Sequence, residues 1–227
     1  MSDSASRLFL LILAAEESSY FDPFELTLLE PATITEGNET VSTSKKEPAA
    51  RRKQIAEYLR KSLCDLCLWH TDELMRSKSG ARVVREVYHS FPSSELADAI
   101  VETTVVTSSG EKVTPMLEDP VGHLFIKNLL LAEAPLDKVK TLMSVDTFKR
   151  HNAMKTEVSF AKAFHEKYDG KLMDVASSNR GAFIVSALAV VDTCRSDVKK
   201  ELKVNMSKLE QLAKEKKGFE ALCAALK

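Results

Sequence analysis

The sequence is poor in glycine and proline, with seven of each among 227 residues. Folds with many tight turns need both residue types, so this scarcity favours helices joined by short connections. An excess of charge of one sign is also lacking. The formal net charge of -1 excludes a strongly basic, dedicated nucleic-acid domain and leaves only local patches for that purpose. The hydrophobic content of 44% is ordinary for a chain that buries a large core.

Motifs that carry catalysis or hold a metal are missing as well. The chain has no HExxH pair, no glycine-rich phosphate loop and no Gly-x-Ser-x-Gly elbow. His165 and Glu166 adjoin, but they fall on a helical surface pattern, where a solvated pair is expected. We therefore expect that the protein is no enzyme and that it uses no metal, cofactor or small-molecule substrate.

The four cysteines lack the pattern of a zinc or redox site. Cys64 and Cys67 form a CxxC, but a structural zinc needs a second pair, which Cys194 and Cys223 do not provide. The CxxC also lies inside a helical pattern rather than after a strand. We interpret its cysteines as small apolar residues of a helical core.

Apolar runs long enough to cross a membrane are lacking too. The unbroken run from Leu8 to Ala15 is far too short to span a bilayer. It imitates the apolar part of a signal peptide, but Asp3 offsets the charge of Arg7. We expect a buried helix here and no membrane partner.

Charge is distributed unevenly along the chain. Between Glu16 and Glu39 there are seven acidic residues and no Lys or Arg. A basic cluster follows, made of Lys45, Lys46, Arg51, Arg52 and Lys53. A second basic zone, from Arg195 to Lys217, has its cations at helical spacing and predicts a solvated helix face.

Four of the seven glycines stand at the start of an apolar helical run. Gly80, Gly122, Gly181 and Gly218 lie 42, 59 and 37 residues apart, which is about the period of helical solenoid repeats with one long insertion. Glycine suits a sharp turn between helices because it adopts positive φ without strain. Ordinary loop glycines in an unrelated helical protein are the alternative, which the recurrence disfavours.

Periodicity and capping residues predict helices along most of the chain. A helix from Ser4 to Ala15 begins almost at the first residue, so we expect the chain to start inside a larger array. We expect three parts: residues 1–30 end a preceding helical repeat, 31–44 are a polar connector, and 45–227 are repeats that finish in a capping helix. A small hairpin is expected at 105–115. Further helices are predicted at 48–69, continuing to about 76 after a break, and at 94–106, 135–143, 155–168, 171–176, 196–204, 207–214 and 218–227. Others begin at Gly80, Gly122 and Gly181, of which the last should be central.

Three segments carry a family resemblance: Thr43 to Lys53, Asp119 to Leu124 with Lys127, and Ala176 to Ala182. With them, the chain resembles the C-terminal part of the Puf-A-like, nucleolar branch of pumilio-homology proteins. At its N-terminal helix, Ala5 stands where that branch typically has glycine. The resemblance implies an all-α fold, an α-solenoid of pumilio-type repeats truncated on its N-terminal side. It also implies that the protein resides in the nucleolus or nucleus and binds structured RNA, including pre-ribosomal RNA, or DNA, without sequence preference. Its implied role is in large-subunit ribosome assembly and rRNA processing, with pre-ribosomal proteins as further partners.

Sequence-specific pumilio repeats read one base each through side chains one and five residues after the glycine. Here those pairs are Ala81 and Arg85, His123 and Lys127, Ala182 and Ser186, and Phe219 and Cys223. None has the residue types of the base code, so we expect no sequence reading. Cations at i, i+4 and i+7 suit phosphate contacts instead. The candidate nucleic-acid-binding residues are Lys78, Arg82, Arg85, His123, Lys127, Arg180, Lys45, Lys46, Arg51, Arg52 and Lys53.

Two functions from different classes remain open at this point. The first is a nucleic-acid-binding module that contacts phosphates. The second is a helical scaffold that binds a partner protein, with RNA contacted by repeats outside this chain. The near-neutral charge and the acidic stretch from Glu16 to Glu39 favour the scaffold, whereas the basic cluster and the row that includes Arg82 favour nucleic acid.

Overall fold

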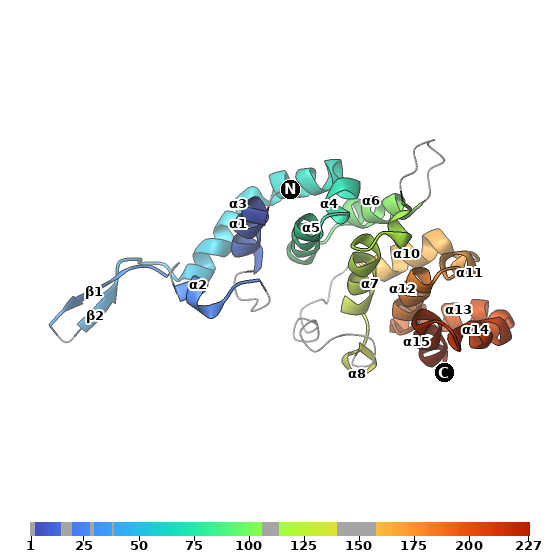
Figure 1. The fold of residues 1–227 in the computed structure, drawn as a ribbon. Coiled ribbons are helices and arrows are strands. Elements are labelled where there is room, and N and C mark those ends of the chain that lie inside the picture. The colour runs from blue at the N-terminus through green and yellow to red at the C-terminus, as the bar shows by residue number, and fades with distance from the viewer. Residues whose placement is uncertain (1–2, 15–19, 28–29, 38, 106–113, 140–157) are drawn as a thin grey trace.

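The computed structural model describes residues 3–14, 20–27, 30–37, 39–105, 114–139 and 158–227. Its helices follow one another in an elongated, curved array, and one two-stranded hairpin projects from the N-terminal end (Figure 1). Apart from that hairpin, the regular elements of the described part are helices, so the all-α prediction is confirmed.

The N-terminal part contains two helices, α1 (Asp3–Ala14) and α2 (Pro23–Thr27), followed by strands β1 (Thr33–Glu36) and β2 (Glu39–Ser42) and the long helix α3 (Pro48–Trp69). Helix α1 is only partly buried. Leu10 and Ala14 face the core while Leu8 is 58% exposed, so the prediction of a buried helix is correct for one face alone.

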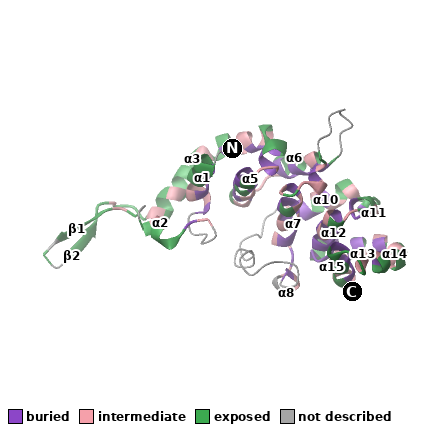
Figure 2. Ribbon diagram, in the orientation of Figure 1, coloured by how far each residue is buried: buried purple, intermediate pink, exposed green. Residues whose placement is uncertain are grey.

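The predicted polar connector folds back on itself. Strands β1 and β2 pair antiparallel with Ile34 opposite Val41, and Gly37 between them has a positive φ. Figure 2 shows this hairpin exposed along its length. The connector is therefore a structured, exposed hairpin, whereas most of the hairpin predicted at 105–115 lies outside the described residues.

The remaining elements form the body of the array. They are α4 (Thr71–Met75), α5 (Lys78–Ser90), α6 (Ser94–Thr104), η1 (Met116–Glu118), α7 (Gly122–Ala132), α8 (Leu136–Val139), α10 (Phe160–Tyr168), α11 (Leu172–Val175), α12 (Asn179–Ala189), α13 (Asp192–Leu202), η3 (Lys203–Asn205), α14 (Met206–Ala213) and α15 (Lys217–Leu226). Of the helices predicted at 135–143 and 155–168, the residues 140–143 and 155–157 lie outside the described part. Helix α13 begins earlier than the predicted 196, at Asp192.

The helices pack in two rows. The glycine row consists of α5, α7, α12 and α15, each of which packs on the next, with α1 against α5 at its N-terminal end. The back row consists of α6, α10 and α13, which also pack in sequence. Figure 1 shows α5, α7 and α12 side by side in the middle of the array.

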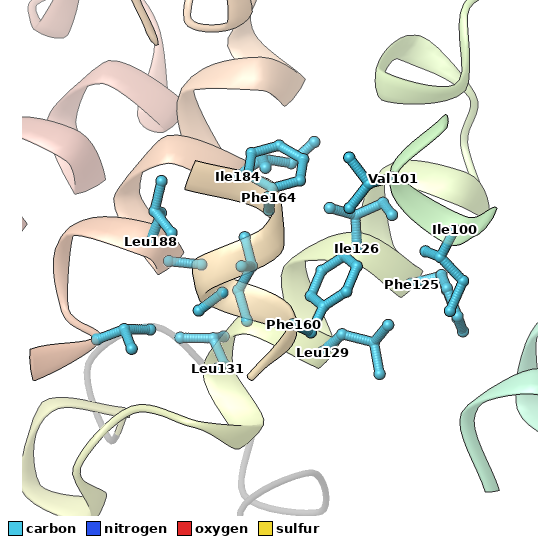
Figure 3. Close-up of a cluster of buried hydrophobic side chains, with 14 of the residues drawn as sticks. Ile100, Val101, Phe125, Ile126, Leu129, Leu131, Phe160, Phe164, Ile184 and Leu188 are labelled. Carbon is cyan, nitrogen blue, oxygen red and sulfur yellow. The ribbon is translucent and has the colours of Figure 1, made fainter. Parts of the chain in front are cut away.

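The core lies between the two rows. Figure 3 shows side chains from α6, α7, α10 and α12 meeting there, among them Ile126, Phe160, Phe164, Ile184 and Leu188, all fully buried. Helix α12 has eight buried residues among eleven, as Figure 2 also shows. The prediction that the Gly181 helix is central is therefore confirmed.

The repeated glycines have a different physical reason from the one that the sequence suggests. Among the described residues, positive φ occurs at Gly37 and Gly170, and not at the four repeated glycines. A Cβ on Gly80 would lie 2.5 Å from the Leu74 carbonyl oxygen, and one on Gly181 would lie 1.7 Å from that of Val175. The glycines are thus required because two backbones approach closely, and the prediction that they supply positive φ is wrong.

A capping residue stands three positions before each of the first three glycines. The side chains of Ser77 and Ser178 accept a hydrogen bond from the N–H of Gly80 and Gly181, both at 3.0 Å, and Asp119 accepts one from Gly122 at 2.8 Å. Each unit is therefore a short helix, a capped turn and a glycine that lets the next helix begin against the first.

The last unit is built differently. The N–H of Gly218 donates to Oδ1 of Asn179 at 2.8 Å, and a Cβ on Gly218 would lie 2.1 Å from the Asn179 carbonyl oxygen. Helix α15 therefore begins against the first turn of α12 rather than against a short helix of its own. This contact fixes how the last helix joins the row.

The CxxC lies in α3. Cys67 is fully buried, which raises the pKa of its thiol to about 12, and Cys64 is half-buried. Cys67 therefore serves as an apolar core residue, as the sequence predicts. No group of three potential metal ligands gathers within the described ranges. In the same part of the chain, none of the helices has the length and apolar character to cross a membrane.

Candidate nucleic-acid interface

A groove of about 420 Å³ runs between α5 and α7. Three predicted cations line it from α5: Lys78 and Arg82, which are exposed, and Arg85, which is half-buried. The other wall carries Leu124, an apolar residue of α7 that is 47% exposed. The groove therefore combines positive charge with an apolar wall.

Tyr20 closes one side of this groove and holds its arginines. The guanidinium carbons of Arg82 and Arg85 lie 5.8 and 5.9 Å from the centre of the Tyr20 ring. Arg85 donates to the Tyr20 hydroxyl and to a carboxylate oxygen of Glu86, to which Tyr20 also donates. Arg85 thus ties the segment before α2 to α5, which leaves Lys78 and Arg82 as the cations that face solvent.

The next cations meet between α7 and α12. Lys127 Nζ lies 5.4 Å from the centre of the Phe183 ring, and Arg180 donates to the Glu118 carbonyl oxygen. His123 belongs to the same group because the positive charges of Arg180 and Lys127 both act on it. The structure therefore brings these three predicted residues close to one another, with Lys127 over the Phe183 ring.

The group between α7 and α12 holds its histidine neutral. Burial is the largest cause that lowers the pKa of His123, followed by the charges of Arg180 and Lys127. Nδ1 of His123 lies 2.7 Å from the Asp119 carbonyl oxygen, so this nitrogen donates and Nε2 is the acceptor of the neutral ring. Burial also lowers the pKa of Lys127. A group of this kind, with clustered positive charge, favours an anion.

A second groove, of about 610 Å³, lies next along the glycine row. Phe183, the ring that lies under Lys127, also lines this groove. Its cations are Lys138 from α8, Arg195 from α13, and Lys217 and Lys227 at the ends of α15, and the acidic residues Asp137 and Glu220 also line it. Arg195 and Lys217 are the two ends of the basic zone that the sequence predicts to be solvated. Local sequence patterns do not single out these four cations, since they come from three separate elements.

The basic cluster lies elsewhere. Lys45, Lys46, Arg51, Arg52 and Lys53 gather where the hairpin leads into α3, away from the glycine row (Figure 1). Arg51 donates to the Ser44 hydroxyl at 2.8 Å and Lys46 to the Gln54 side chain, so two of these cations order the start of α3. The eleven predicted residues thus fall into three groups, two of them along the glycine row.

The positions that would read bases are mostly covered. Ala81, Ala182, Ser186, Phe219 and Cys223 are all buried. Of the remaining three, Arg85 is bound to Tyr20 and Glu86, and His123 and Lys127 are half-buried. A base edge therefore meets few of the side chains that could hydrogen-bond to it.

Sequence comparison places the chain among known proteins. The CPL (NUC119) domain family matches residues 1–141. Pumilio homolog 3 of Danio rerio is 25% identical over 227 residues, and that of Homo sapiens is 25% identical over 236 residues. These matches cover 97% and 100% of this chain but 33% of each relative. The chain thus spans about a third of the length of the curated relatives it matches.

Solved structures show the same fold. A crystal structure of human Puf-A in complex with DNA matches 98% of this chain and 39% of its own, with a TM-score of 0.73 and 23% identity. A second crystal structure of human Puf-A matches 96% of this chain and 39% of its own, with the same TM-score and 24% identity.

Proposed function

Because the chain belongs to the CPL (NUC119) domain family, we propose that it is a sequence-independent binding module for RNA or DNA that contacts phosphates rather than base edges. Its fold is that of a pumilio-like helical array, as the likeness to human Puf-A shows. The observation that carries the proposal is the line of cations along the glycine row, from Lys78 and Arg82 to Lys127 and Arg180, beside base-reading positions that are buried.

The arrangement fits a phosphate backbone in two ways. The cations come from successive helices and so repeat along the array, as the phosphates of a strand do. Tyr20 and Phe183 lie under the cationic groups of Arg82 and Lys127, which reduces the freedom of these side chains before a ligand arrives. Such contacts fix where a nucleic acid lies but carry no sequence information. That human Puf-A has been crystallised with DNA supports the proposal.

The cellular role follows from the resemblance alone. We infer that the chain is part of a nucleolar assembly factor of the large ribosomal subunit, with structured pre-ribosomal RNA and pre-ribosomal proteins as partners. A tagged chain that stays outside nucleoli, or that does not sediment with large-subunit precursors, would contradict this part of the proposal.

The first test is a fluorescence-anisotropy titration of the whole chain with a structured RNA and with unrelated single strands. We expect similar affinities for all sequences, because phosphates are common to them. We also expect a steep fall in affinity as salt rises, since each neutralised phosphate releases a counterion and adds about 0.7 to 0.9 to the logarithmic slope. Strong preference for one sequence, or affinity that is independent of salt, would contradict the proposal.

A protein-binding scaffold is the alternative, and the acidic residues between Glu16 and Glu39 favour it. Glu25 shows that part of this acidity is used within the chain, since it pairs with Arg7. Absence of nucleic-acid binding even at low salt would favour the scaffold.

Binding should tighten as the pH falls from about 7.5 to about 6. The pKa of His123 is lowered in the free protein, so the ring is neutral near pH 7 and binds a proton only at more acidic pH. A phosphate beside it would favour the charged ring and raise that pKa, so binding takes up a proton.

The comparison for this prediction is His123→Gln, which keeps a hydrogen-bonding side chain but does not titrate. The ratio of the Kd at pH about 7.5 to the Kd at pH about 6 should be several-fold larger for the unchanged protein than for the variant. The stability of the free protein should change in the opposite direction to its affinity. The unfolded chain binds the proton more readily than the folded one, so His123 lowers the free energy of unfolding as the pH falls below about 6.5. Equal ratios for both proteins would show that His123 does not face the ligand.

A further inference from the structure

Helix α3 exposes two aromatic rings on one line. Tyr58 is 88% exposed and Trp69 is 78% exposed, and Trp69 follows Tyr58 by eleven residues, or about three turns. Both rings therefore point to the same side of the helix. Rings of this size are normally buried or engaged, so an exposed pair in register is a feature to be explained.

The same helix is cationic. It carries five Lys or Arg residues against two acidic residues, Glu57 and Asp65. Arg51 lies seven residues, about two turns, before Tyr58 and is on the same line as both rings. It donates one hydrogen bond to Ser44, which leaves further donors of its guanidinium for a ligand. Lys61 is exposed beside the line. The basic cluster at the start of α3 extends this positive surface.

The spacing decides which ligand fits. The two rings lie about 16 Å apart along the helix axis, too far to form one apolar patch for a protein partner. Of the residues on the line between them, Ser62 is neutral and Asp65 is acidic, and the exposed Lys61 beside the line is the cation between the rings. A single strand needs separate flat rings on which individual bases stack, with cations for the phosphates between them. In a duplex the bases are stacked on one another, so their faces do not reach such rings.

We propose that this line of residues, Arg51, Tyr58 and Trp69 on the outer face of α3, is a second nucleic-acid contact that binds single strands by stacking. The proposal rests on the proposed function in that the ligand is nucleic acid, but it uses side chains on another helix than the glycine row. It explains why a basic cluster stands apart from that row: it supplies charge to a stacking surface.

Trp69 is the only tryptophan of the chain, so its emission reports on this surface directly. The experiment titrates the whole chain with an oligothymidylate of about 20 nucleotides and with the corresponding dA·dT duplex, at low salt. Binding is followed by anisotropy and by Trp69 emission in parallel. We expect the single strand to quench the emission and the duplex to bind with little quenching. Tyr58→Ala should weaken the single-strand affinity about tenfold, while Tyr58→Phe, which keeps the ring, should not.

Two control variants separate the outcomes. Val204→Ala removes a side chain that is 89% exposed on another element and should change nothing. Arg82→Gln should weaken the affinity for the duplex, while the single strand should still quench the Trp69 emission. If the strands bind but the emission does not change and Tyr58→Ala has no effect, the stacking surface is wrong and the row of phosphate contacts stands, which leaves the rings to a protein partner. If no nucleic acid binds, both proposals fail.

Discussion

Replacing Gly181 with alanine should lower the free energy of unfolding by about 3 kcal/mol or more. The new methyl carbon would lie 1.7 Å from the Val175 carbonyl oxygen and 2.9 Å from its carbonyl carbon. Both atoms belong to the backbone of α11, so no side-chain rotation relieves the clash. Helix α12 would have to move away from α11, and its buried residues pack against α7 and α15 as well. Thermal unfolding followed by circular dichroism should show a midpoint lower by on the order of 10 °C.

The other repeated glycines should follow a defined order. Gly218→Ala places the methyl 2.1 Å from a backbone oxygen, and Gly80→Ala places it 2.5 Å from one. Gly122→Ala should cost least, because the nearest atom is the flexible Met116 sulfur at 2.2 Å, with the first backbone atom at 2.9 Å. Gly170→Asn is the control: that position has positive φ, which Asn tolerates, and open space around it. If Gly181→Ala were as stable as the control, close approach would not be why these units begin with glycine.

The recurrence of glycine could be read from the sequence, and it located the helices of the glycine row. The reason for it could not be read, because close approach depends on where the preceding short helix lies. One readable signal was missed. Ser77, Asp119 and Ser178 each stand three residues before a glycine, and a Ser or Asp in that place marks a helix start. Gly218 lacks such a residue, which could have foretold that the last unit is built differently.

The hairpin shows a second limit. Its strands are rich in Thr, Ile and Val around a Gly37 turn, which favours paired strands. The side chains of both strands, where their burial is described, are nevertheless exposed. Neither face of the described hairpin is buried, so the sequence need not alternate between apolar and polar residues. A strand pattern without a buried face resembles a polar linker, which is why the sequence predicts a connector at this place.

The candidate site was predictable only in part. Helical spacing placed Lys78, Arg82 and Arg85 on one face, and the structure keeps them together. Helical spacing could not show that Tyr20, 65 residues before Arg85, would bind that arginine. The second groove likewise combines three elements that are distant in sequence. Contacts between distant segments depend on the packing of the rows, which local patterns do not encode.

The largest effect on binding is expected from removing three charges of the glycine row together, as Arg82→Gln, Lys127→Gln and Arg180→Gln. Affinity for structured RNA at low salt should fall about a hundredfold or more, equally for all sequences. The logarithmic salt slope should fall by about one for each phosphate that is no longer neutralised. Glutamine keeps part of the length of each side chain, so packing near Phe183 is largely retained. Arg85 is left in place because it bonds the side chains of both Tyr20 and Glu86, and its loss would alter the fold as well as the charge. Arg180 bonds one backbone oxygen, that of Glu118, so Arg180→Gln alone should first be shown to keep the thermal unfolding midpoint.

The matched control removes three equal charges that do not line either groove: Lys171→Gln, Lys203→Gln and Lys208→Gln, all of exposed residues. Both triple variants change the net charge by the same amount, so long-range attraction to the polyanion falls equally in the two proteins. Only the row variant should lose most of its affinity and its salt slope. Equal losses in both variants would mean that nucleic acid is attracted by overall charge and not held along α5, α7 and α12, and the phosphate row would then have to be abandoned.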